Sequence, residues 1–228
     1  YYERKFKDLY KYYKKQLFNN NKFDEHVLSL KLIYIILTKQ YNYLGNITEN
    51  IKIFMKLNTK NYQNLDIQAI LDFWYFFKIL GYGDIFKPNE VFIKTIITEM
   101  NKDSKTDYDK VLFYIYLRIL EYCGNYQFSE NYKIFLKNNI KDKIFYGYYL
   151  THVILYDLEF GFKNINEIQD RRDIDEAINE LILLCKDSEI LILENADLLG
   201  EIVICLILCN IKNNLLYLQI YNILNKIE

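Results

Sequence analysis

Long stretches of the chain carry apolar residues at positions i, i+3, i+4 and i+7, and few residues interrupt them. Only one proline and seven glycines occur among 228 residues. Apolar side chains at this spacing lie on one face of an α-helix, and an unbroken pattern of this kind is typical of packed amphipathic helices. The pattern therefore predicts an all-α protein.

About eleven helices are predicted when glycines, asparagine-rich segments and charged clusters are taken as the breaks between them. Short connections favour antiparallel neighbours, and eleven such helices fit either an α/α toroid or a helical solenoid. No repeat of fixed period is found, which favours the toroid while leaving the solenoid open. The predicted ranges are 2–18, 24–42, 46–58, 66–80, 89–101, 108–123, 129–138, 142–160, 171–186, 190–209 and 213–227.

Several predicted helix ends carry residues suited to that place. Asp107 directly precedes the sixth helix and is its expected N-cap, because a short acidic side chain can accept hydrogen bonds from free backbone N–H groups. Asn89 follows the single proline, where the fifth helix is expected to begin. Gly81 and Gly124 are expected to close the fourth and sixth helices in the left-handed conformation.

The chain is predicted to form a single domain over residues 1–228, because no segment is rich enough in proline, glycine or serine to act as a linker. At this length a chain buries roughly 70% of its unfolded surface, so its core needs no disulfides or metals. The 23 tyrosines and 15 phenylalanines predict aromatic contacts between the helices.

The charge and hydropathy of the chain argue against two classes of partner. Its net charge is −1, from 29 basic and 30 acidic residues. A nucleic-acid-binding protein needs a basic excess to neutralise phosphates, so we expect no nucleic-acid partner. The longest purely apolar stretch, Ile202–Cys209, is far shorter than the ~20 residues that cross a bilayer, so no membrane span is expected.

The four cysteines are expected to be reduced and buried. They are flanked largely by apolar residues. Cys205 and Cys209 share a helix face and could supply two ligands to a soft metal, but no histidine is near them in sequence. Two small buried core residues are the favoured interpretation, and no metal site is predicted. Free cysteines point to a reducing, cytoplasmic setting.

A histidine within an aromatic helix is the first candidate for chemistry. His152, Tyr156 and Glu159 stand at i, i+4 and i+7 and would form one stripe along the predicted helix 142–160. An imidazole, a phenol and a carboxylate on one face can perform acid–base catalysis or bind a polar ligand. The alternative is a core histidine whose ring nitrogens are satisfied by neighbouring groups.

A pair of acids beside a glycine is the second candidate. Asp197 and Glu201 are one helical turn apart, with Gly200 between them. A glycine in mid-helix costs ~1 kcal/mol, so it would indicate close approach of another helix or of a ligand. Alternatively the helix begins here, with Asp197 as its cap and Glu201 favoured by the helix dipole. We expect His152 to face the carboxylate of Glu201 or Asp197, with Glu201 catalytic and Asp197 and Gly200 in ligand binding.

Arg118 is the third candidate. It is one of only four arginines and the only one inside an apolar helix. Its guanidinium could pair with a buried carboxylate such as Glu201 or Glu159 and contribute to ligand binding. The alternative is a side chain whose stem lies along the surface with its charged end in water.

Two segments resemble a bacterial family of all-helical proteins of unknown function. Members carry Thr-His-x-x-(Phe)-Tyr-x-x-Asp-Phe-Gly followed by Asp-Leu-Leu-Gly-Glu, and here the segments are Thr151–Gly161 and Asp197–Glu201. Glu159 stands where the family has aspartate, and its longer side chain would reach a different point. The match covers about sixteen positions. The resemblance implies no activity, only that the two segments belong together.

Two classes of function follow. One is a small-ligand-binding protein or acid–base enzyme, in which the two segments converge on one concave pocket. The other is a non-catalytic helical module that binds a protein or peptide, an accessory in a biosynthetic or peptide-handling pathway, in which the segments lie apart or pair internally. No phosphate-binding loop, serine-hydrolase elbow or zinc-peptidase motif occurs, and the cofactor is left open.

Overall fold

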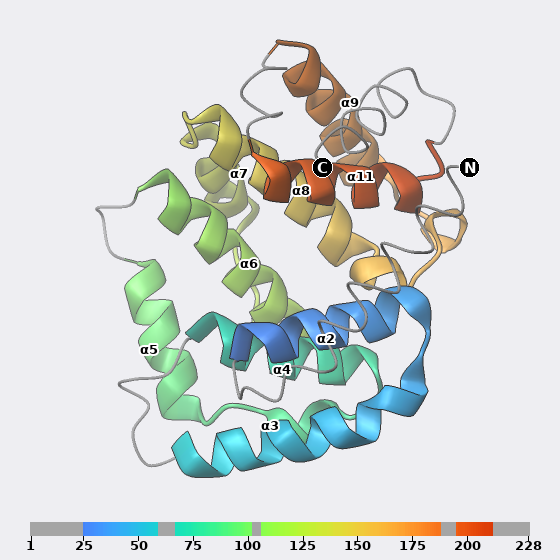
Figure 1. The fold of residues 1–228 in the computed structure, drawn as a ribbon. Helices are drawn as coiled ribbons and strands as arrows, with labels where there is room; N and C mark the ends of the chain where they lie inside the picture. The colour runs from blue at the N-terminus through green and yellow to red at the C-terminus, as the bar shows by residue number, and fades with distance from the viewer. Residues whose placement is uncertain (1–24, 59–66, 102–105, 188–194, 212–228) are drawn as a thin grey trace, which may run out of the picture. The chain divides into compact units, whose positions relative to one another are not determined.

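The computed structural model describes residues 25–58, 67–101, 106–187 and 195–211 (Figure 1). Within these ranges the chain forms nine α-helices and four short 3-10 turns, with no strand. The all-α prediction is therefore confirmed. The chain divides into two compact units, Tyr1–Phe92 and Ile93–Glu228, and the boundary between them falls inside α5 (Glu90–Met100).

The first unit is built around a helix that is apolar on nearly all sides. It contains α2 (Glu25–Thr38), η1 (Tyr41–Tyr43), α3 (Leu44–Asn58), α4 (Ile67–Ile79) and η3 (Gly83–Phe86). Nine of the thirteen residues of α4 are buried, and α2 packs against both α3 and α4. A helix that is apolar all round is a core helix. The chain after α4 folds back onto this helix, and the ring centroids of Phe77 in α4 and Phe86 in η3 lie 4.3 Å apart.

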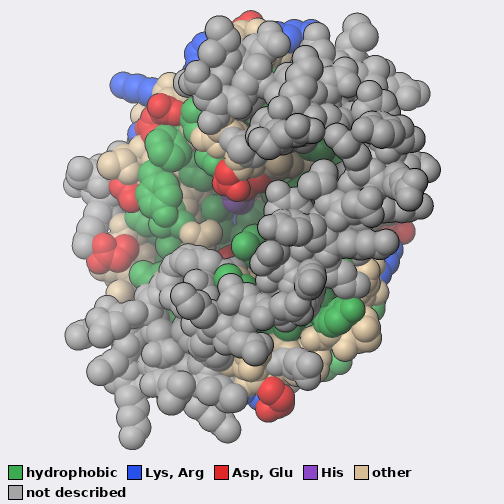
Figure 2. Space-filling model, viewed as in Figure 1, with side chains coloured by type: hydrophobic (Ala, Val, Ile, Leu, Met, Phe, Trp, Pro, Cys, Tyr) green, Lys and Arg blue, Asp and Glu red, His purple; other side chains and the backbone are tan. Residues whose placement is uncertain are grey.

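The second unit has α8 (Lys143–Asp157) at its centre. Around it are α6 (Asp107–Gly124), α7 (Glu130–Asn138), η4 (Glu159–Gly161), η5 (Ile165–Glu167), α9 (Arg172–Asp187) and α11 (Ala196–Leu208). Helix α8 packs against α6, α9 and α11 (Figure 1). In the same view, Figure 2 shows acidic side chains beside a histidine over α8 and α11.

Nine of the eleven predicted helices coincide with α-helices of the described residues. The predicted helices 2–18 and 213–227 lie outside those residues. Three ends differ by several residues: α2 stops at Thr38, α8 stops at Asp157 and α11 begins only at Ala196. The single domain, the total of eleven helices and their closure into a toroid or solenoid stay predictions.

The N-cap of α6 is Thr106 and not Asp107, so that prediction was wrong. Thr106 Oγ1 accepts a hydrogen bond from the backbone N–H of Asp109 at 3.1 Å, and the Asp109 carboxylate accepts one from the backbone N–H of Thr106 at 2.9 Å. This reciprocal pair is a capping box. It moves Asp107 into the first turn of the helix, where its side chain is available for another contact.

The other predicted helix ends are partly confirmed. Asn89 Oδ1 accepts from the backbone N–H of Phe92 at 2.8 Å, as expected at the start of α5. Gly81 has φ +84° and closes α4 in the left-handed conformation. At the end of α6 the left-handed residue is Asn125, with φ +55°, and not Gly124. Asparagine is the residue that most readily replaces glycine in that conformation.

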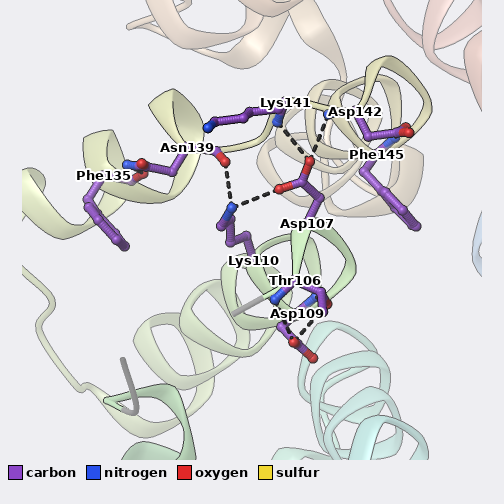
Figure 3. Close-up of polar contacts among 9 residues, drawn as sticks. All are labelled: Thr106, Asp107, Asp109, Lys110, Phe135, Asn139, Lys141, Asp142 and Phe145. Atoms are coloured by element: carbon purple, nitrogen blue, oxygen red, sulfur yellow. Dashed lines mark hydrogen bonds and ion pairs between the residues drawn. The ribbon is translucent and has the colours of Figure 1, made fainter. Parts of the chain in front are cut away.

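The freed carboxylate of Asp107 ties the start of α6 to the start of α8 (Figure 3). Its Oδ2 accepts from the backbone N–H groups of Lys141 and Asp142 at 2.8 and 2.7 Å. Its Oδ1 pairs with Lys110 Nζ at 2.7 Å, and that amine also donates to the backbone carbonyl of Asn139. Asp142 is in turn the N-cap of α8. One side chain thus fixes the place where α8 begins.

These contacts also hold Asp107 in its ionised form. The hydrogen bond from Lys110, followed by that from the backbone of Asp142, lowers the pKa of Asp107 from 3.8 to about 2. A depressed carboxylate pKa stabilises the folded state at pH values above the unfolded pKa.

We expect Asp107→Ala to lower the free energy of unfolding by about 1–2 kcal/mol, because three hydrogen bonds to a charged group are lost. Urea denaturation measures this. Glu130→Ala is the matched control: it removes an acid from the first turn of α7, where the helix dipole and an exposed ion pair with Lys133 are each worth ~0.5 kcal/mol. Equal losses in the two variants would mean that Asp107 acts only through the dipole and its ion pair.

The stabilisation by Asp107 should also depend on pH. It is complete above the unfolded pKa of 3.8 and is lost as pH falls through the folded value of about 2. The difference in unfolding free energy between the wild type and Asp107→Ala should therefore shrink in acid. A difference that stays constant over this range would contradict the assignment.

Candidate functional site

Helix α11 packs closely on α8 at Gly147. A Cβ atom at Gly147 would lie 2.9 Å from Leu198 Cδ2 and 3.3 Å from Leu184 Cδ2. The sequence had indicated a close approach at Gly200, but no described atom lies within 4 Å of its Cβ position. The close approach of another helix at Gly200 is thus not found, while its part in ligand binding stays a prediction, and the glycine in close contact between the two helices is on α8.

Asp197 and Glu201 lie in the first two turns of α11. The helix begins at Ala196, and its N-cap is Asn195, whose Oδ1 accepts from the backbone N–H of Leu198 at 3.0 Å. Of the two interpretations of this segment, the one in which the helix starts here is confirmed, although Asp197 is not the cap. Negative charge near a helix N-terminus is favourable.

Hydroxyl groups on α8 satisfy both of these carboxylates. Thr151 Oγ1 donates to Glu201 Oε2 at 2.6 Å, and the hydroxyl of Tyr148 donates to Asp197 Oδ2 at 2.9 Å. Thr151 is completely buried. Tyr148 pairs with Asp197, and Thr151, three residues further along α8, pairs with Glu201, four residues further along α11. The two helices therefore run in the same general direction where they touch.

His152 faces Glu201, as the sequence predicted, and not Asp197. His152 Nδ1 lies 3.7 Å from Glu201 Oε2, and the two side chains are 15% and 24% exposed. This distance is too long for a hydrogen bond. The bond from Nδ1 goes instead to the backbone carbonyl of Tyr148, at 2.6 Å. Glu201 is thus a charged neighbour of the imidazole, while its own hydrogen bond comes from Thr151.

The predicted stripe of three residues is broken at its third member. The rings of His152 and Tyr156 stack, with centroids 6.1 Å apart. Glu159, however, follows the end of α8, so its predicted place on the helix was wrong. Glu159, Phe160 and Gly161 have φ values of +48°, +53° and +86°. The left-handed conformation is strained for a residue with a side chain, and two such residues precede the glycine here.

The turn places the carboxylate of Glu159 in the interior. Its side chain is 5% exposed and pairs with Lys163 Nζ at 2.6 Å. The hydroxyl of Tyr122 also forms a hydrogen bond with Glu159. Burial, and then the charge of Glu159, raise the pKa of Tyr122. Glu159 is therefore a buried, oriented anion with partners on both sides.

Arg118 pairs with Asp157, a largely buried carboxylate that is neither of the two acids named as examples. The ion pair joins Arg118 Nη2 to Asp157 Oδ1, and the two side chains are 25% and 19% exposed. Asp157 is the last residue of α8. Burial raises the pKa of Asp157, while Arg118 opposes that rise. The acid next to the predicted stripe, which the sequence analysis did not single out, is the partner of this arginine.

A cavity of about 320 Å³ opens where α8 ends, and we call it the α8-end cavity. Its walls contain three ion pairs: Arg118 with Asp157, Lys163 with Glu159, and Arg172 with Asp170 at 2.6 Å. The described residues that line it are Arg118, Tyr122, Tyr156, Asp157, Glu159, Lys163, Ile168, Asp170, Arg172 and Asp173.

The predicted site residues therefore form two groups. His152, Asp197 and Glu201 meet where α8 packs on α11, and Gly200 lies beside them without the expected close contact. Arg118, Tyr156 and Glu159 line the α8-end cavity. The stack of Tyr156 on His152 connects the two groups. The sequence analysis missed Tyr148 and Thr151, although both lie within one turn of His152.

The cysteines show the expected burial with one exception. Cys123, Cys185 and Cys205 are buried, Cys209 is partly exposed, and none forms a disulfide. Burial raises the pKa of Cys185 and of Cys209 to about 11. Within the described residues, no group of three or more histidine, cysteine, aspartate or glutamate side chains could hold a metal ion. No helix in that part of the chain is long and apolar enough to cross a membrane.

Comparisons of the chain with protein families, with curated proteins and with solved structures gave no match. The resemblance to an all-helical bacterial family stays a prediction.

We expect Thr151→Val to lower the free energy of unfolding by about 1–2 kcal/mol, because Glu201 loses its hydrogen bond beside a buried apolar group. Thermal or urea denaturation measures the change. Thr98→Val is the matched control, since the Thr98 hydroxyl is exposed and donates only to the carbonyl of Lys94 in its own helix. If both variants lose the same stability, the contact between Thr151 and Glu201 contributes nothing specific.

Proposed function

We propose that the unit Ile93–Glu228 binds a small polar molecule in the α8-end cavity. The observation that carries this proposal is the cavity itself, with a volume of about 320 Å³ and fixed charges of both signs in its walls. Ligand sites are concave, with volumes of roughly 300–1,000 Å³ and a few oriented polar groups. Tyr122 and Tyr156 add aromatic surface to the polar lining.

The lining is oriented before any ligand arrives, which supports binding. Arg118 is held by Asp157, and Glu159 is held by Lys163 and Tyr122. The strained turn at Glu159 is what directs its carboxylate inward. Strain of this kind persists where the surrounding structure enforces it, and it is concentrated at functional sites. Groups fixed in advance lose little conformational entropy on binding.

The pairing of His152 favours a binding role over a catalytic one. Its Nδ1 is bonded to Tyr148, its neighbour Glu201 is bonded to Thr151, and Asp197 is bonded to Tyr148. Segments that pair internally in this way are those expected of a protein without chemistry at these residues. We assign His152 to the support of Tyr156, against which its ring stacks.

A second candidate function is acid–base catalysis by His152. It is favoured by the bond from Nδ1 to the Tyr148 carbonyl, because in the neutral imidazole this bond leaves the lone pair on Nε2. The carboxylate of Glu201 at 3.7 Å would stabilise the imidazolium after proton uptake. Tyr156, Glu159 and Glu201 would then act with His152, as the sequence suggested.

A peptide or protein partner is the remaining alternative. It is supported by two large apolar side chains on α7, Ile134 and Phe135, which are 52% and 47% exposed.

The free cysteines support a reducing, cytoplasmic setting. A role as an accessory in a bacterial biosynthetic pathway, and closure of the helices into a toroid or solenoid, remain part of this proposal.

Filling the cavity should abolish ligand binding. Ile168→Trp places a bulky ring in the lining without removing a charge, and Leu183→Trp makes a similar change at an exposed position of α9 outside the cavity. In a thermal-shift screen of polar metabolites, ligands that stabilise the wild type should stabilise Leu183→Trp but not Ile168→Trp. Stabilisation of Ile168→Trp to the same extent would refute the proposed site.

Replacing His152 separates the binding role from the catalytic one. We expect His152→Gln to lower the free energy of unfolding by about 1 kcal/mol, because the imidazole bond and the ring stack are lost. Calorimetric affinity for a ligand found in the screen should change less than about threefold. Loss of turnover with unchanged stability and affinity would instead establish acid–base catalysis by His152.

A further inference from the structure

We infer that the ligand of the α8-end cavity is a protonated amine carrying a short hydrocarbon chain. The inference rests on the proposed function and names the chemical class that this cavity recognises.

One carboxylate among the lining residues is not paired with a cation of the lining. Four acids face three bases there, and each base is in an ion pair with one of the acids. The fourth acid, Asp173, forms no ion pair within the described part of the chain. The described residues of the lining therefore carry a net charge of −1, and each of their cations is already paired with an acid. A bound anion would have to displace an existing partner, whereas a bound cation would not.

The acids near the cavity also act unfavourably on one another. Burial raises the pKa of Asp157, and the charge of Asp173 adds to that rise against the effect of Arg118. A positive charge in the cavity would relieve this repulsion, because an opposite charge favours the ionised form of a carboxylate.

An aromatic ring provides a second kind of attraction for a cation. Tyr122 and Tyr156 both line the cavity. Tyr156 is buried and lies against the rings of His152 and Phe160, whereas Tyr122 is 37% exposed and is the ring that a ligand can reach. The face of an aromatic ring attracts ammonium groups and does not attract carboxylates. The ring of Tyr122 and the unneutralised carboxylate thus select the same head group.

The space for a hydrocarbon chain is a second cavity of about 220 Å³ that adjoins the first. The two cavities share Arg118 and Asp173 in their walls. Its lining has charged side chains and an apolar part that includes Ile134, Leu150 and Val153. An amine held near Asp173 can therefore extend an apolar chain over these three residues, where its CH₂ groups are removed from water.

The test uses three probes with the same chain and different head groups: hexylamine, hexanoate and 1-hexanol. Calorimetric titration of the full chain at neutral pH should show hexylamine binding at least about tenfold more tightly than either of the others. Asp173→Asn should weaken hexylamine binding about threefold or more, since it removes the unneutralised charge. The matched control is Asp187→Asn, at the opposite end of the same helix, which should leave the affinity unchanged.

The outcomes distinguish this inference from the proposed function. If hexanoate or hexanol binds as tightly as hexylamine and Ile168→Trp blocks it, the cavity is a ligand site but the amine assignment is wrong. If Asp173→Asn and Asp187→Asn weaken hexylamine equally, or if Ile168→Trp leaves its binding intact, the amine does not bind in this cavity. If none of the three probes binds, the inference is overturned, while the metabolite screen decides the proposed function separately.

Discussion

Helix α8 is packed against three other helices, and its buried polar side chains therefore need partners within the protein. This requirement explains most of the polar contacts of the second unit. Thr151 and Tyr148 donate to acids on α11, and the imidazole of His152 turns back to its own helix. Asp157 forms an ion pair with Arg118 of α6. The polar groups that follow one another along α8 in the sequence are, in the folded protein, the groups whose pairing allows this aromatic helix to be buried.

The two ends of α8 are controlled by different means. At its beginning, Asp107 holds the backbone of Asp142 and so fixes the cap of the helix from 35 residues away. At its end, the left-handed residues that begin with Glu159 turn the chain sharply and direct a carboxylate into the interior. The α8-end cavity lies at this second end, where the backbone no longer follows the helix. Packing holds α8 in place, and the proposed ligand site lies at the end of the helix, where the chain leaves the helical conformation.

The sequence predicted the helices well because their apolar spacing is local information. It also predicted that His152 would face Glu201, since each needed a partner. It could not show that Asp107 would serve a distant backbone instead of its own helix, because that choice depends on tertiary contacts. It also extended α8 through Glu159, because the helical spacing continues there and positive φ values before a glycine leave no periodic signal. For Arg118 the sequence indicated a buried carboxylate but not that it would be Asp157, because only packing distinguishes one acid from another.

Gly147 has a consequence for the whole contact between α8 and α11. It stands one turn before Thr151 on the same face of α8, and Leu198 occupies the space where its side chain would be. Because Gly147 has no side chain, its contact with Leu198 sets how far apart the two helix axes lie. A wider separation of the two helices would lengthen or break the 2.6 Å hydrogen bond from Thr151 to Glu201. A residue with no side chain, and no polar atom of its own, determines which polar atoms one turn away can meet.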